Sequence, residues 1–204
     1  MRWLAVASLL LLFAAGVSAN EALSVCYNYG CQSEDEVLFS DVQLRRVGEL
    51  LMDGRGVTHE RALLGVAIGW MLGWAGEQTP IASDRGGNFA DDGVYGRMDC
   101  IDHSTTTTRL LHLIERRGWL RYHRVLDPAL RSSFLIFEHF AAQIEVIEPA
   151  ESFAEKAPTG DVPERYVVDS WFFDNGQPAV VMPLDSWLAG EGPDVDDERN
   201  NQRP

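Results

Sequence analysis

The pattern of apolar residues changes from helical to strand-like at Gly118, and this change limits the possible folds more than any other feature of the chain. Before Gly118, apolar side chains recur at intervals of three and four residues, which is typical of packed helices. After Gly118, short runs rich in β-branched and aromatic residues predict strands. Helices followed by strands predict an α+β fold, with N-terminal helices packed on an antiparallel sheet.

Three helices are expected before the change, at residues 40–54, 58–76 and 100–118. Ser40 and Gln43 form a capping-box pattern at the start of the first helix. Thr58 is placed to cap the second, which is apolar on most sides and therefore expected to be buried. In the third, Ser104 and the four threonines through Thr108 are poor helix formers, so either packing holds them helical or the regular helix starts later; apart from that, the run is expected to be a polar, solvent-facing stretch.

Five strands are expected after the change, at Trp119–Val125, Phe134–Phe140, Ala142–Ile147, Tyr166–Phe172 and Ala179–Met182. A charged, proline-containing connection, Pro149–Glu164, separates two of them, and Pro183–Leu188 is expected to form a short helix or turn. The segment from Glu77 to Met98 is rich in Gly, Asp and Asn, which predicts a long ordered loop. Ordered loops of this length are often functional.

Residues 1–19 have the pattern of a secretory signal peptide. A basic start precedes an apolar run from Trp3 to Val17, and the small residues at its end predict cleavage after Ala19. The alternatives are a retained membrane anchor, for which the run is short, or lipid attachment at Cys26. The protein is therefore expected to be secreted or periplasmic, with no stable membrane insertion after cleavage.

The rest of the chain divides into an N-terminal segment at 20–36, a single α+β domain at 37–189 and a disordered acidic tail at 190–204. The 17 basic and 31 acidic side chains give a formal net charge of −14. Nucleic acids and anionic membrane surfaces attract basic patches, so this charge argues against nucleic acid as a partner.

Export would place the three cysteines in an oxidising compartment, where one disulfide leaves one thiol free. Cys26 and Cys31 are close in sequence, and Gly30 eases the turn that a small ring requires, so we expect a Cys26–Cys31 disulfide. Cys100 would then be the free thiol. The alternative is a disulfide between Cys100 and either Cys26 or Cys31.

Cys100 lies where a glycine-rich loop enters the third expected helix. In a first helical turn, unpaired backbone N–H groups and the helix dipole favour the thiolate, which is the nucleophilic form. The same N–H groups can hold the oxyanion of a tetrahedral intermediate. Asp99 and Asp102 oppose a negative charge on the sulfur, so the nucleophile is expected to depend on a histidine.

A thiol nucleophile works best beside an imidazole that a third group orients. His139 lies in one expected strand, 39 residues after Cys100, and Asp169 lies in the next apolar strand after the charged connection. If these strands are neighbours, His139 and Asp169 can meet while the helix start brings Cys100 over the imidazole. The alternative for Cys100 is a small, inert, buried side chain.

The order of these elements resembles the transglutaminase-like superfamily, within the wider papain-like cysteine fold. The matching segments, at about residues 90–172, are Cys100, Gly118, Arg121–Val125, His139-Phe140-Ala141, Ile144-Glu145-Val146 and Val168-Asp169. The chain departs from the family pattern in lacking Trp after the His and in the long insertion before Asp169. The resemblance implies a Cys-His-Asp triad that transfers an acyl group to water or to an amine, with no cofactor.

The sequence thus favours an exported enzyme that acts on the amide bonds of peptides, with peptides or cell-wall peptides as the plausible substrates. Three nearby side chains are candidates to help hold the oxyanion: Gln78, Asn88 and Tyr95. One alternative is a non-catalytic exported binding or scaffold domain of the same fold. Another is a zinc site made from Asp99, Cys100, Asp102 and His103, although no His-Glu-x-x-His or paired Cys-x-x-Cys spacing is present.

Overall fold

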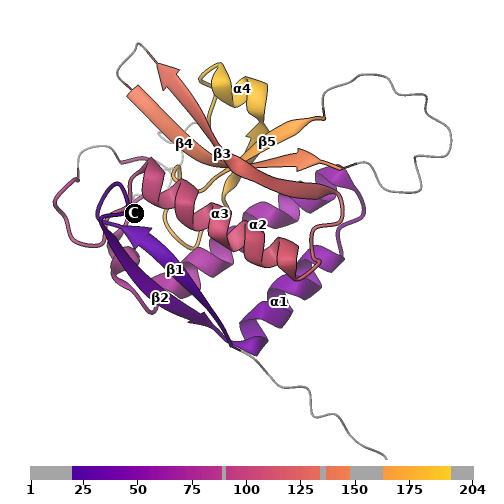
Figure 1. The fold of residues 1–204 in the computed structure, drawn as a ribbon, viewed down its shortest axis with the longest axis horizontal. Coiled ribbons are helices and arrows are strands. Elements are labelled where there is room, and N and C mark those ends of the chain that lie inside the picture. The colour runs from indigo at the N-terminus through magenta and orange to yellow at the C-terminus, as the bar shows by residue number, and fades with distance from the viewer. Residues whose placement is uncertain (1–19, 89–90, 134–136, 148–162, 194–204) are drawn as a thin grey trace, which may run out of the picture.

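The computed structural model describes residues 20–88, 91–133, 137–147 and 163–193 (Figure 1). The expected signal peptide, most of the connection at 149–164 and the tail beyond residue 193 lie outside the described residues. The described part is an α+β fold, as the sequence predicts, and it contains two antiparallel sheets.

A β-hairpin that was not expected from the sequence opens the described part of the chain. Its strands, β1 (Glu21–Tyr27) and β2 (Ser33–Phe39), pair antiparallel. One face of the hairpin is buried because alternate side chains are apolar, including Val25, Val37 and Phe39. The predicted Cys26–Cys31 disulfide is present at the turn of this hairpin and leaves Cys100 as the free thiol.

The three long helices lie close to their predicted positions. α1 (Asp41–Met52) begins with the predicted capping box of Ser40 and Gln43. In α2 (Val57–Gly76) the prediction of a Thr58 cap is wrong, because Gly56 occupies the cap position and the helix already includes Thr58. A short 3-10 helix, η1 (Pro80–Ser83), interrupts the loop before α3 (Cys100–Arg116).

Four strands form the second sheet, in the order β3-β4-β5-β6. They are β3 (His123–Ser133), β4 (Phe137–Val146), β5 (Arg165–Asp169) and β6 (Val180–Pro183). The described parts of the two strands expected at 134–140 and 142–147 form one continuous strand, because β4 pairs with β3 on both sides of a register shift between Leu126 and Ala129. The strand expected at Trp119–Val125 instead starts at His123 and continues to Ser133. The short helix α4 (Leu184–Leu188) follows β6.

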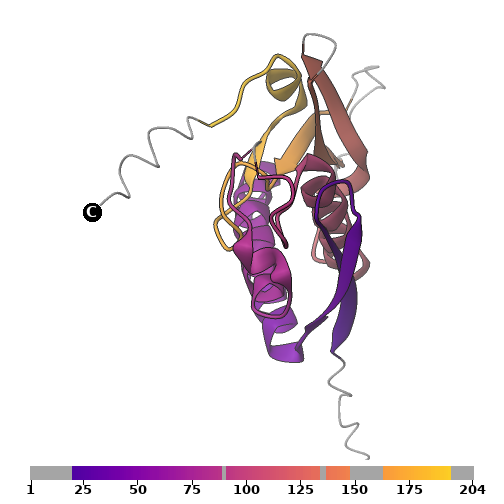
Figure 2. The same ribbon diagram turned by 90° about the vertical axis from the view of Figure 1, so that its left-hand side faces the viewer.

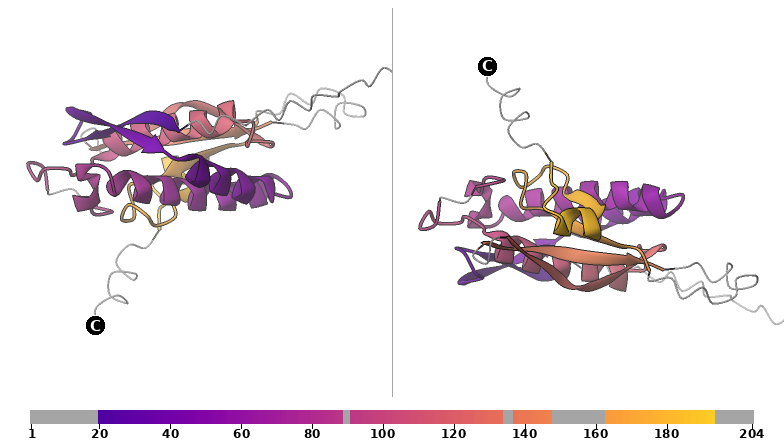
Figure 3. Two further views of the ribbon diagram at one scale, coloured as in Figure 1. Left: turned by 90° about the horizontal axis from the view of Figure 1, so that it is seen from below. Right: turned by 90° about the horizontal axis from the view of Figure 1, so that it is seen from above.

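The two faces of this sheet are covered by different helices. Ala142, Ile144 and Val168 belong to the main core, which also contains the buried faces of α2 and α3. On the opposite face, Ala141 and Val167 pack against Trp187 of α4. Figure 3 shows α1 and α2 as one layer, with the hairpin and α3 in a layer beside it. Figure 2 shows the hairpin and α3 on one side of the molecule and α2 on the other.

The polar start of α3 is buried, so the prediction of a solvent-facing stretch after Ser104 is wrong. Thr106 and Thr107 have no exposed surface. They are tolerated inside because their hydroxyls find partners: Thr106 accepts from the backbone N–H of Cys26 at 3.0 Å, and Thr107 contacts Ser170 at 2.9 Å. The threonine run therefore joins α3 to the hairpin and to the end of β5.

None of the helices in the described ranges is long and apolar enough to cross a lipid bilayer.

Candidate active site

Cys100 is the first residue of α3, and its side chain is half-buried. The helix starts there because Asp99 is an N-cap whose carboxylate accepts from the N–H of Asp102, while the Asp102 carboxylate accepts from the N–H of Asp99. The thiol contacts the backbone carbonyl of Glu138 in β4 at 3.8 Å. The helix start is therefore held against the strand that carries His139.

The sheet register places His139 and Asp169 on one face. In the antiparallel pair of β4 and β5, Ala142 lies opposite Val168, so Asp169 lies opposite Ala141. Ala141 is two residues from His139 along β4. Alternate residues of a strand share a face, and this face is the one that α4 covers. Nε2 of His139 lies 2.7 Å from Oδ2 of Asp169.

Asp169 is only 1% exposed, and three donors surround its carboxylate. Oδ2 accepts from Nε1 of Trp187 at 3.0 Å as well as from His139, and Oδ1 accepts from the backbone N–H of Trp171 at 3.1 Å. A buried carboxylate with several hydrogen-bond donors is fixed in place beside the imidazole.

Two side chains, Asp169 and Cys100, act on the imidazole of His139. Burial alone lowers the pKa of His139, but hydrogen bonds and charge from Asp169 and Cys100 outweigh burial and raise the pKa to about 9. Because Nε2 faces Asp169, Nδ1 remains for the sulfur of Cys100. The structure thus brings Cys100, His139 and Asp169 together in the order thiol, imidazole, carboxylate, which is the order required for proton transfer.

Aromatic side chains enclose the imidazole. The ring centroids of Trp171, Phe172 and Trp187 lie 5.1, 5.9 and 5.6 Å from that of His139. The guanidinium of Arg131, the cross-strand neighbour of His139, lies 4.6 Å from the ring centroid of Trp187. These rings limit the access of water to His139 and Asp169 and fix the plane of the imidazole. This function could not be assigned to Trp187 from the sequence, because α4 lies beyond residues 90–172, the segment that resembles the family.

The helix start supplies backbone donors for an oxyanion. The N–H groups of Cys100 and Ile101 occupy the first two positions of α3, where no intrahelical acceptor exists. The side-chain candidates are less suitable. Both ends of the Gln78 amide are bonded, to the N–H of Leu38 and the carbonyl of Trp74, and the Tyr95 hydroxyl contacts that of Tyr27 at 3.4 Å. Asn88 lies half-buried in the loop between η1 and α3.

A second buried histidine network lies next to the site and was not expected from the sequence. Nε2 of His103 lies 3.0 Å from Oδ2 of Asp84, and Nδ1 lies 3.0 Å from Oγ of Ser170. All three residues are at most 6% exposed, and Ser170 directly follows Asp169. The network joins the loop after η1, the first turn of α3 and the end of β5. No spacing in the sequence links Asp84 to His103, so only the folded chain could have shown the contact.

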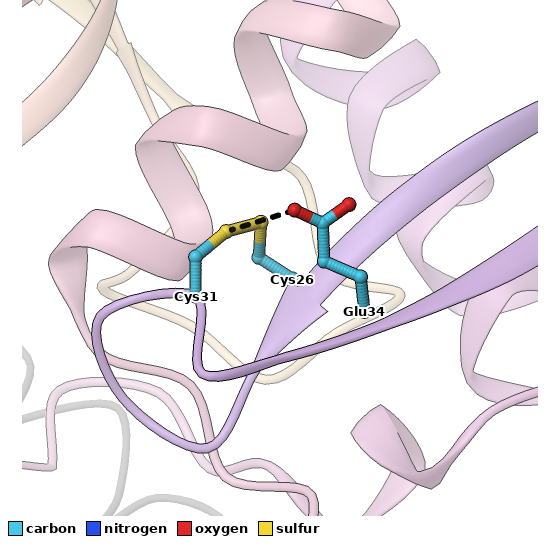
Figure 4. A group of neighbouring side chains, drawn as sticks. All are labelled: Cys26, Cys31 and Glu34. Carbon is cyan, nitrogen blue, oxygen red and sulfur yellow. Dashed lines mark hydrogen bonds between the residues drawn. A yellow bond between two sulfur atoms is a disulfide. The ribbon is translucent and has the colours of Figure 1, made fainter.

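The structure does not assemble the zinc site considered from the sequence. His103 points to Asp84 and Ser170, whereas the carboxylates of Asp99 and Asp102 bond to the helix start and to the turn of the hairpin. Within the described part of the chain, one group of three potential metal donors lies close together, namely Cys26, Cys31 and Glu34 (Figure 4). Its two sulfur atoms are bonded to each other, so they are not thiolate ligands.

No protein-family model, curated protein or solved structure matches the chain.

Proposed function

We propose that the protein is an exported thiol-dependent acyl-transfer enzyme that cleaves or transfers the amide bonds of peptides. The observation that supports this most strongly is the contact between Cys100, at a helix start, and His139, whose other nitrogen is bonded to the buried Asp169. A structural role for Cys100 alone would not require a buried carboxylate behind its imidazole partner.

In the proposed reaction, the Cys100 sulfur attacks the carbonyl carbon of an amide, and Nδ1 of His139 holds the thiol proton. The N–H groups at the start of α3 stabilise the oxyanion of the tetrahedral intermediate. His139 then gives the proton to the leaving nitrogen as the C–N bond breaks, which leaves a thioester on Cys100. Water or an amine attacks the thioester, loses its proton to His139, and releases the product as the proton returns to sulfur.

The resemblance to the transglutaminase-like superfamily and the wider papain-like fold supports this assignment, since Cys100, His139 and Asp169 come from the corresponding elements. The expected signal peptide and the Cys26–Cys31 disulfide favour a secreted or periplasmic location. Peptides, including cell-wall peptides, are the substrate class that such a location offers to a thiol acyltransferase.

The experiment supplies the purified protein with a mixture of synthetic peptides, including cell-wall stem peptides, in the presence of hydroxylamine. Hydroxylamine captures a thioester as a hydroxamate, so acyl transfer is detected whichever acceptor is natural. We expect hydroxamate formation by wild-type protein and a loss of at least about a thousandfold in Cys100→Ala, because the nucleophile is absent.

The matched control is His112→Ala, which alters a half-exposed histidine of α3 that pairs with Glu115 and should leave the rate unchanged. The proposal fails if wild type produces no more hydroxamate than Cys100→Ala with any peptide. That result would favour the non-catalytic binding or scaffold domain.

A further inference from the structure

The turn that joins β1 to β2 has an unusual backbone. Asn28, Tyr29, Gly30 and Cys31 all have positive φ angles, of 65°, 64°, 66° and 58°. Residues with a side chain rarely adopt this left-handed conformation, and four in succession require strong external restraints. The Cys26–Cys31 disulfide provides one, by closing the turn into a small ring (Figure 4).

A left-handed turn directs successive N–H groups to the same side, where they can surround an anion. Here the anions are the two carboxylates that flank Cys100. The N–H groups of Tyr29 and Cys31 donate to the Asp102 carboxylate at 2.8 and 2.6 Å, and the N–H of Gly30 donates to Asp99 at 2.9 Å.

These contacts bear on the helix start that carries the candidate nucleophile. Asp99 and Asp102 form the capping box of the helix that begins at Cys100, and the Cys100 thiol is a hydrogen-bond partner of His139 in β4. Burial, together with the charge of Asp99, raises the pKa of Asp102 to about 6, although backbone N–H groups from the turn act in the opposite direction. The turn therefore favours the charged form of Asp102 and fixes the position of both carboxylates that cap the helix start at Cys100.

The strands of the hairpin are attached to α3 independently of the turn. The N–H of Cys26 donates to Thr106 at 3.0 Å, and Arg109 donates to the carbonyl of Ser24 and to Glu34. Loss of the disulfide should therefore leave β1 and β2 in place and relax the turn. This separation makes the function of the disulfide testable apart from the stability of the fold.

We propose that the disulfide-closed turn at residues 28–31 is a positioning element for Cys100, because its backbone N–H groups hold the Asp99 and Asp102 carboxylates that cap the helix start and so keep the sulfur beside His139. This inference rests on the proposed function and extends it. The disulfide forms in the oxidising compartment in which the chain is expected to work. It would thus affect the reactivity of Cys100 without forming a bond to it.

The test compares wild type with the double variant Cys26→Ser/Cys31→Ser, in which Cys100 is the only cysteine left. Alkylation of Cys100 by iodoacetamide is followed from pH 5 to pH 10. We expect the profile of the double variant to move upward by about half to one pH unit, a three- to tenfold slower reaction at pH 6. Glu36→Gln is the matched control, because it alters an exposed side chain of β2 in the same hairpin and should leave the profile unchanged.

Two outcomes separate this inference from the proposed function. If wild type and the double variant both react rapidly with the same profile, the turn does not position Cys100, while the proposed function stands. If wild type itself reacts no faster than a free thiol, the proposed function fails, and this inference fails with it.

Amide hydrogen exchange on wild type keeps the inference testable should the double variant not fold. The inference requires slow exchange at the N–H groups of Tyr29, Gly30 and Cys31, since all three are hydrogen-bonded to carboxylates. Exchange at the rate of an unstructured peptide would overturn it.

Discussion

Replacing His139 with Ala should slow the alkylation of Cys100 at pH 6 by at least about tenfold, because the imidazolium that stabilises the thiolate is lost. A free thiol is only about 0.3% thiolate at this pH. In the wild-type protein, His139 contacts the sulfur, and its raised pKa of about 9 keeps the ring protonated. Iodoacetamide alkylates Cys100 alone, since the other two cysteines form the disulfide, so the measured rate is that of Cys100.

The control for this measurement is His112→Ala on the same helix. His112 pairs with Glu115 and is half-exposed, so its loss should leave the rate unchanged. Equal rates in wild type and His139→Ala would mean that the imidazole does not activate the thiol, and the proposed function would fail.

Asp169→Asn should lower the free energy of unfolding by about 3 kcal/mol at pH 6. The carboxylate accepts from His139, Trp187 and the N–H of Trp171, and all of these groups are buried. An amide has one acceptor oxygen and one donor nitrogen, so at least one buried donor would face the NH₂ group without an acceptor. The loss is measured by urea unfolding.

The effect of Asp169→Asn should depend on pH. The folded-state pKa of His139, about 9, lies above its ordinary value of 6.5, so the protonated ring stabilises the folded state. This contribution is fully present below pH 6.5 and is lost as the pH rises through 9. The difference between wild type and Asp169→Asn should therefore be larger at pH 6 than at pH 9.5.

Asp185→Asn provides the comparison, since Asp185 is exposed in α4 and should change the stability by less than about 0.5 kcal/mol. A difference for Asp169→Asn that is below about 1 kcal/mol and equal at both pH values would show that the pair carries no charge-dependent stabilisation.

The convergence of Cys100, His139 and Asp169 could be anticipated from the sequence because each lies at a position that local patterns define. Cys100 follows an N-cap and opens a helix. His139 and Asp169 were expected in apolar strands with another strand, at 142–147, between them, and they lie on neighbouring strands because that segment continues the strand of His139 as β4. Antiparallel neighbours are the simplest arrangement of such strands.

Other features of the site depend on contacts between distant segments and could not be predicted. The hairpin formed by β1 and β2 contacts α3 through residues about 70 to 80 positions apart. Asp84, His103 and Ser170 have no common motif, and each alone is an ordinary polar residue. The threonines of α3 are poor helix formers that only packing could keep helical, and the sequence did not show that Thr106 and Thr107 are buried by hydrogen bonds to Cys26 and Ser170.

The most direct test of the candidate site is the titration of His139 by NMR in wild type and in Cys100→Ser, with the signal of His139 assigned among the five histidines by a His139→Gln variant. We expect a midpoint near 9 in wild type, because Asp169 and Cys100 both favour the protonated ring, and a lower midpoint in Cys100→Ser. A midpoint near 6.5 that is the same in both proteins would show that thiol, imidazole and carboxylate do not act as one unit.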